Sequence, residues 1–272
     1  MRDRYPAGPE TPLLYNHAVF PPLFAELASF LFGLVVGSFL NVVIARVPDG
    51  RSIVTPPSAC PACGAPIRWY DNIPVLSWLW LRARCRSCRA FISWRYPAVE
   101  LVTAVLFLLA ARQYGVAPDL GPALLLLAAL VAITFIDLDH QIIPDVITLP
   151  GIVLGAVLGV VLHPAAWLDT LLGILVGGGL FLVIILASKG GMGGGDMKLG
   201  AMMGAFLGWK LVLLGILLGV FGGGAVAIAL LSTGAKGRKD PLPFGPFLAL
   251  GGAISLLWGP AILAWYLGRF LD

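Results

Sequence analysis

Two groups of acidic residues lie at the ends of long apolar stretches. Asp137, Asp139 and Asp145 follow one such stretch, and Asp196 follows the glycine run 193–195. Ionisable groups in or beside a membrane are energetically expensive, so they are candidates for function. Two close carboxylates share one proton, so that one can deprotonate a water while the other polarises a carbonyl. The pattern therefore predicts that Asp196 and one acid of the first group could hydrolyse an amide without a covalent intermediate.

Each of these acids also has a simpler interpretation. Asp145 and Asp196 could be helix N-caps, and Asp139 could be a solvated residue at a helix end. Asp137 differs because, on a helix, it shares a face with the apolar Leu130 and Ile133, which predicts burial. Because Asp196 would begin a helix and Asp137 would end one, the helix dipoles favour Asp196 as the ionised partner.

The four cysteines form two pairs with metal-ligand spacing: Cys60 with Cys63, and Cys85 with Cys88. Two such C-x-x-C turns are typical of a tetrahedral Zn²⁺ site. With all four ligand positions filled, the zinc would be structural. A small insert has a small hydrophobic core, so a bound metal ion would stabilise its fold. The alternative is two structural or redox-labile cysteine pairs.

The composition assigns the rest of the chain to a membrane. Of 272 residues, 59% are apolar and only 12% are charged, with a mean hydropathy of +0.93. A soluble domain cannot bury that much apolar surface, and the same numbers exclude a disordered or fibrous chain.

We therefore expect an all-α polytopic membrane protein of about eight transmembrane helices, with a small cytoplasmic zinc-ribbon-like insert. The domains would be a polar N-terminal tail (1–20), a first transmembrane helix (21–45), a four-cysteine zinc-binding module (46–96) and a seven-helix membrane core with the acidic site (97–272). The predicted spans cover residues 23–45, 97–112, 121–138, 146–162, 167–187, 197–208, 211–231 and 245–268. Glycines recur every four residues within three of these spans, which predicts close helix packing.

Most of the 18 lysines and arginines fall on the side of the insert. By the positive-inside rule, the four-cysteine module would lie in the cytoplasm and both termini would face outward. The arginines of the insert suit anionic lipid headgroups, and no recognition helix or aromatic ladder indicates nucleic acid.

Taken in order, several motifs resemble the bacterial prepilin peptidases, also called type IV leader peptidases. The motifs are Gly37-Ser38-Phe39-Leu40-Asn41, the two cysteine pairs, Asn72-Ile73-Pro74, Arg95-Tyr96-Pro97 with Glu100, Asp137 before Pro144-Asp145, and Gly193-x-Gly195-Asp196. One departure is the stretch Leu81-Arg82-Ala83-Arg84 before the second cysteine pair, where the family often has a glycine.

The resemblance implies a membrane aspartic protease whose catalytic pair is Asp137 and Asp196, with Gly193, Gly195 and Lys198 in the loop that substrate approaches. It implies cleavage of the basic leader of prepilins or pseudopilins after a glycine, at the cytoplasmic face of the inner membrane. It also implies N-methylation of the new N-terminus with S-adenosylmethionine, and partners in pilus or type II secretion assembly.

Some assignments stay open at this point. Asp139 and Asp145 could bind the basic leader. Methyl transfer could use polar groups near the insert, although no G-x-G-x-x-G fingerprint is present and interhelical hydrogen bonding explains them equally well. These groups are Ser38, Asn41, Arg46, Asn72 and Glu100. A transporter, or a secretion scaffold with a regulatory zinc module, remains the alternative function.

Overall fold

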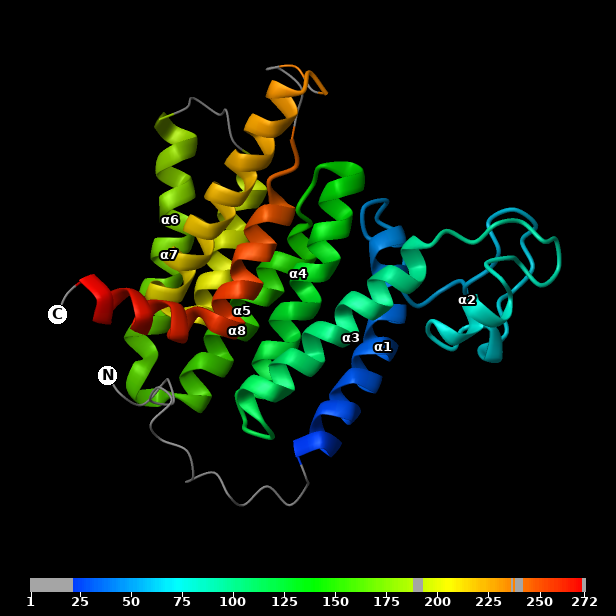
Figure 1. Ribbon diagram of the computed structural model, residues 1–272, viewed down its shortest axis with the longest axis horizontal. Coiled ribbons are helices and arrows are strands. Elements are labelled where there is room, and N and C mark those ends of the chain that lie inside the picture. Colours follow the sequence, from blue (N-terminus) through cyan, green and yellow to red (C-terminus); the bar gives the residue numbers. More distant parts are fainter. Residues whose placement is uncertain (1–21, 188–192, 236, 238–241, 271–272) are drawn as a thin grey trace. The chain divides into compact units, whose positions relative to one another are not determined.

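The structure is a computed structural model that describes residues 22–187, 193–235, 237 and 242–270. Within these ranges the chain is helical apart from turns and two isolated β-bridges (Figure 1). Seven described helices are long and apolar enough to cross a membrane. The predicted all-α multi-pass fold is thereby confirmed, whereas the predicted tail at 1–20 and the last two residues lie outside the described ranges.

The described residues form eight α-helices, and the chain divides near residue 120 into two compact units. The first unit holds α1 and α3 with the cysteine module between them, and the second holds α4 to α8. The helices are α1 (Pro22–Arg46), α2 (Leu76–Trp80), α3 (Arg95–Tyr114), α4 (Leu120–His140), α5 (Asp145–Leu162), α6 (Trp167–Ala187), α7 (Gly194–Ser232) and α8 (Gly245–Phe270).

In the first unit, α1 and α3 pack side by side through glycines of α1. A Cβ placed on Gly37 would lie 2.6 Å from Cα of Glu100, so any side chain there would force the two helices apart. At the other end of the pair, Arg112 Nε donates to Glu26 Oε2 at 2.8 Å. This contact fixes the register of α1 against α3.

In the second unit, α7 packs against α5, α6 and α8. Cβ atoms on Gly200 and Gly204 would meet the backbone oxygens of Gly177 and Gly173 on α6, which leaves no room for alanine. This confirms the predicted close packing through the glycines of α7, because small residues let membrane helices approach. The matching glycines of α6 were not predicted.

The helix α7 is interrupted at Gly208, whose φ of 75° and ψ of 174° are not helical. Beyond this break, Gly215 lies beside Met203, so the two stretches contact each other: a Cβ on Gly215 would be 3.2 Å from the Met203 methyl. Spans six and seven were predicted as separate helices with a break at Trp209. The structure confirms two helices and places the break between them at Gly208, so the label α7 covers both.

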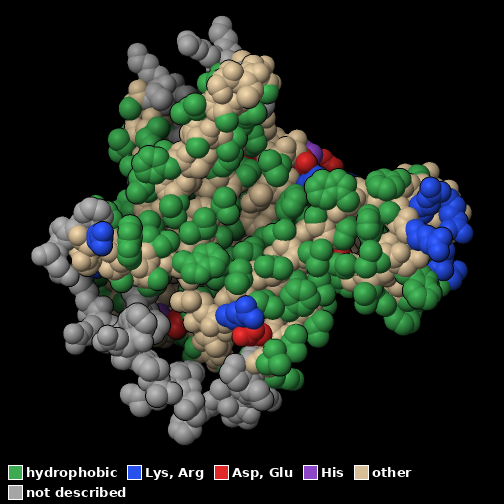
Figure 2. Space-filling view, viewed as in Figure 1, with side chains coloured by type: hydrophobic (Ala, Val, Ile, Leu, Met, Phe, Trp, Pro, Cys, Tyr) green, Lys and Arg blue, Asp and Glu red, His purple; other side chains and the backbone are tan. Residues whose placement is uncertain are grey.

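Large apolar side chains cover much of the molecular surface (Figure 2). Phe221 and Leu175, for example, expose 68% and 59% of their surface, while Leu126 and Ile133 are fully buried. Monomeric soluble proteins rarely expose so much apolar surface, whereas lipid solvates it.

Candidate active site and metal centre

The carboxylate of Asp137 lies in the last turn of α4 and is 5% exposed. Its Oδ2 accepts the backbone N–H of Gly245, the first residue of α8, at 2.9 Å. A Cβ on Gly245 would lie only 2.7 Å from the same oxygen. The predicted burial of Asp137 is confirmed. Gly245 was missed, although the Pro- and Gly-containing run 243–246 before an apolar stretch is a signal for it.

Asp196 lies in the first turn of α7 and is half-buried. Its carboxylate is within range of electrostatic interaction with Asp137. The residue at the N-cap position is Gly193, so the alternative interpretation of Asp196 as an N-cap is wrong. The fold thus brings together the two acids that were paired from the sequence, although 59 positions separate them in the chain.

The two glycines before Asp196 differ in their surroundings. A Cβ on Gly195 would lie 2.9 Å from Cβ of Ile143, so this position packs tightly against the segment before α5. A Cβ on Gly193 would meet nothing closer than Oδ2 of Asp196, at 4.0 Å. Among the residues that the structure describes, none fills the space beside the Asp196 carboxylate at Gly193.

Asp145 and Lys198 form an ion pair in which Nζ lies 2.6 Å and 2.7 Å from the two carboxylate oxygens. The N-cap of α5 is Pro144, which corrects the interpretation of Asp145 as the cap. Asp139 is exposed at the end of α4. The helix ends that carry Asp139, Asp145 and Asp196 all meet at one end of the second unit.

A contact that the sequence did not reveal bears on which of the two acids is ionised. The expectation that Asp196 is the ionised partner considered only the dipoles of the two helices that carry the acids. The N–H of Gly245 makes Oδ2 of Asp137 a hydrogen-bond acceptor, and an N–H at a helix start stabilises negative charge. A proton held by Asp137 therefore belongs on Oδ1. The ionised form is favoured at Asp196 by the helix dipole and at Asp137 by the Gly245 N–H, so either acid can be the ionised partner.

The four cysteines of the first unit come together as predicted. Their sulfurs all lie within 4.8 Å of one another, and Sγ of Cys60 is 3.8 Å from Sγ of Cys88. A tetrahedral site with metal–sulfur bonds of about 2.3 Å has sulfur–sulfur edges of about 3.8 Å. The donor set and its spacing fit a metal ion held by four thiolates.

Two matching turns shape this site. The N–H groups of Cys60 and Cys85 donate to the carbonyls of Ala65 and Ala90 at 2.9 Å and 2.8 Å. Hydrogen bonds from the backbone N–H groups of Cys88 and Ser87 lower the pKa of the Cys85 thiol to about 6, whereas the neighbouring thiols raise the pKa of Cys88 to about 11. Because metals bind thiolates, turns that stabilise a thiolate favour metal binding.

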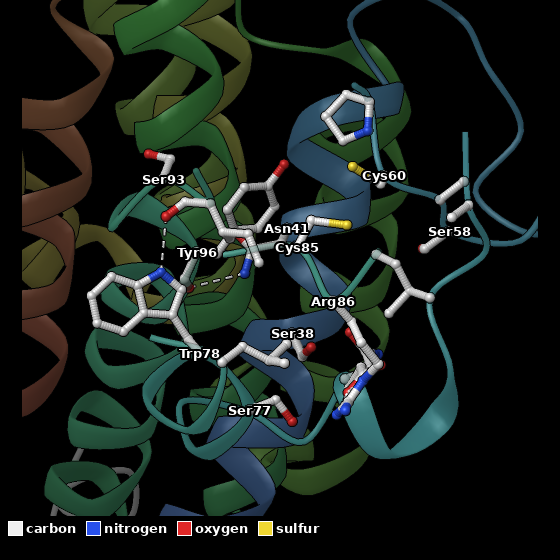
Figure 3. A pocket seen from close by; sticks show the side chains of 18 of the residues that line it. Ser38, Asn41, Ser58, Cys60, Ser77, Trp78, Cys85, Arg86, Ser93 and Tyr96 are labelled. Atoms are coloured by element: carbon white, nitrogen blue, oxygen red, sulfur yellow. Dashed lines mark hydrogen bonds and ion pairs between the residues drawn. The ribbon is translucent and has the colours of Figure 1, made fainter. Parts of the chain in front are cut away.

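The polar residues considered for methyl transfer all line one cavity of the first unit, with a volume of about 620 Å³ (Figure 3). They come from α1, from the module and from α3: Ser38, Asn41, Arg46, Asn72 and Glu100. The sequence alone gave no reason for them to converge.

The fold and these sites define a class: a multi-pass helical membrane protein with an acid pair at one bundle end and a four-cysteine module. Family models match the two parts of the chain separately. The bacterial peptidase A24 N-terminal domain matches residues 31–114, and the type IV leader peptidase family matches residues 124–228. The chain belongs to the type IV leader peptidase family.

Curated relatives extend the similarity to most of the chain, and each is called a prepilin leader peptidase/N-methyltransferase. The Aeromonas hydrophila protein is 43% identical over 89% of this chain and 93% of its own length. The Pseudomonas aeruginosa protein is 39% identical over 93% of this chain and 97% of its own length. The Myxococcus xanthus protein is 49% identical over 81% of this chain and 67% of its own length. No solved structure matches the chain. These findings favour an enzyme over a transporter or scaffold.

Proposed function

We propose that this protein cleaves the basic leader from prepilins or pseudopilins, with Asp137 and Asp196 as the catalytic acids, and that it then N-methylates the new N-terminus. The observation that carries the proposal is the convergence of these two carboxylates at one end of the second unit. The names of the relatives support the same two reactions.

In the proposed hydrolysis, the ionised acid takes a proton from a water, and the water oxygen adds to the scissile carbonyl carbon. The protonated acid donates its proton to the carbonyl oxygen. The C–N bond then breaks as the departing amine takes the proton held by the first acid, and one hydroxyl of the intermediate returns a proton to the second acid, which leaves a carboxylic acid product. With Oδ2 of Asp137 held by Gly245, its Oδ1 would face the water or the carbonyl.

The substrate would be bound at the same end of the bundle. The open position at Gly193 suits close approach of an extended peptide to Asp196, with Gly195 and Lys198 completing the loop. The basic leader would be attracted by Asp139 and Asp145. Since Lys198 already pairs with Asp145, the leader would have to compete with that lysine.

The cofactors and location follow the same reasoning. Zn²⁺ would be held by Cys60, Cys63, Cys85 and Cys88, where four thiolates leave no open position for catalysis. S-adenosylmethionine would be the methyl donor. We place the enzyme in the bacterial cytoplasmic membrane, with the module and the acids on the cytoplasmic side and both termini outward. Its partners would be the pilus or type II secretion machinery.

The test is co-expression with a prepilin, followed by mass spectrometry of the pilin N-terminus, which reports cleavage and methylation together. Asp137→Asn and Asp196→Asn should each lower cleavage at least about 100-fold, because each removes an acid–base group. Asp119→Asn, which lies at the opposite end of α4, is the matched control. Normal cleavage by either active-site variant would reject the acid pair.

A further inference from the structure

The cavity of the first unit is built like a ligand site. It lies where the cysteine module meets α1 and α3, and its volume of about 620 Å³ is within the usual range for small-molecule sites. All its lining residues belong to one compact unit. Figure 3 shows side chains from α1, the module and α3 around it, among them Ser38, Trp78 and Tyr96.

Glu100 gives the cavity a buried carboxyl group, which is also hydrogen-bonded by the side chain of Ser38. Its side chain is 7% exposed, and Oε2 accepts the backbone N–H of Val75 at 2.7 Å. Among the described residues, no lysine or arginine forms an ion pair with Glu100. A buried carboxylate without a cation is energetically expensive, so a positively charged ligand would supply the missing partner.

The opposite charge lines the same cavity. Arg46 uses one of its N–H groups on the carbonyl of Ser52 at 2.9 Å, which leaves further donors in its guanidinium. Arg86 is already neutralised, because it holds both oxygens of Asp71 and lowers the pKa of that carboxyl. The cavity therefore suits a ligand that carries cationic groups together with a carboxylate.

Aromatic groups line the cavity as well, and local bonds hold them in place. The indole N–H of Trp78 donates to the carbonyl of Ile92 at 3.0 Å. The side-chain amide of Asn41 donates to the carbonyl of Tyr96 at 3.1 Å, which leaves its own oxygen as an acceptor (Figure 3). A flat heterocycle with an exocyclic amine could stack on the rings and donate to that oxygen.

We propose that this cavity is the S-adenosylmethionine site and that Glu100 interacts with the sulfonium of the methyl donor. The donor combines an adenine, an ammonium, a sulfonium and a carboxylate, which are the groups that the cavity accommodates. The inference rests on the methyltransferase part of the proposed function and is independent of Asp137 and Asp196, which lie in the other unit.

The test compares two ligands on the full-length protein in nanodiscs by isothermal titration calorimetry. S-adenosylmethionine carries the sulfonium charge, and S-adenosylhomocysteine has a neutral sulfur in its place. Glu100→Gln should weaken binding of S-adenosylmethionine about tenfold and binding of S-adenosylhomocysteine by less than about threefold, because only the first loses an attraction between full charges.

The matched control is Asp119→Asn, which removes an acid of the same unit outside the cavity and should leave both affinities unchanged. Retained prepilin cleavage and bound metal show that Glu100→Gln is folded. Loss of cleavage in Asp137→Asn with normal donor binding separates the two proposals. Equal affinities of wild type and Glu100→Gln for S-adenosylmethionine would overturn this inference.

Ultraviolet cross-linking of tritiated S-adenosylmethionine gives an independent readout. Label in the peptides that cover residues 38–100 supports the site, and label only in α4 to α8 overturns it. Anionic lipid is the competing occupant. If binding of S-adenosylmethionine falls as the phosphatidylglycerol content of the nanodisc rises, the cavity is a headgroup site and the inference is wrong.

Discussion

The backbone N–H of Gly245 donates a 2.9 Å hydrogen bond to Oδ2 of Asp137, and this contact joins the start of α8 to the end of α4. It selects one oxygen of a buried carboxylate as an acceptor and thereby fixes where its proton can be. It also requires glycine, because a Cβ at position 245 would lie 2.7 Å from that oxygen.

Gly245→Ala should therefore displace the Asp137 carboxylate. We expect kcat for leader cleavage to fall at least about tenfold with KM little changed, because a small displacement of a catalytic group lowers the rate more than binding. Steady-state kinetics on a prepilin measures both constants. Gly224→Ala, where a Cβ meets nothing within 4 Å, is the control. Unchanged kcat in Gly245→Ala would show that the contact does not position Asp137.

The packing of α6 on α7 gives a second prediction. A Cβ at Gly204 would clash with the backbone oxygen of Gly173, and backbone cannot move as a flexible side chain does. Gly204→Ala should destabilise the protein by about 1–3 kcal/mol, the usual effect of overpacking. Thermal unfolding in detergent reports the loss. Gly179→Ala on α6, where the space is open, should leave the melting temperature unchanged or raise it, and equal behaviour of the two variants would contradict the close approach.

Ala83, which lies in the stretch that departs from the family pattern, gives a third prediction. Ala83 has a φ of 58°, in the left-handed region that favours glycine, and it is held there because its N–H donates to the carbonyl of Trp78 at 2.9 Å. Ala83→Gly should stabilise the module by about 1 kcal/mol, since the left-handed conformation costs an alanine about that much. The rate of metal loss to a chelator should fall accordingly. Ala90→Gly, at a position without a positive φ, should not slow it.

The fourth prediction concerns binding of the leader. Asp139→Lys should raise KM for a prepilin with a basic leader about fivefold at low salt and less at high salt, because exposed charges are screened. The value of kcat should stay unchanged. Asp49→Lys reverses a charge in the other unit and serves as the control. A KM that is unchanged in both Asp139→Lys and Asp145→Lys would remove the proposed role of these acids.

The membrane class and the clustering of the four cysteines could be predicted from the sequence because they depend on local properties. Apolar stretches of sufficient length must cross the bilayer, and the two C-x-x-C pairs already have ligand spacing. The family motifs likewise named Asp137 and Asp196 as a pair. The glycine period predicted close packing for α7, and a helix boundary was predicted one residue from Gly208.

Only the tertiary structure revealed contacts between distant segments. Gly245 donates to Asp137 across 108 positions, and Lys198 pairs with Asp145 across 53. Glu100 similarly joins Asn41 and Arg46 in one cavity. Hydropathy and spacing describe a helix along its own axis, but they do not say which face meets which neighbour. That choice follows from backbone packing at glycines, so the partners of the acids became visible only in the folded chain.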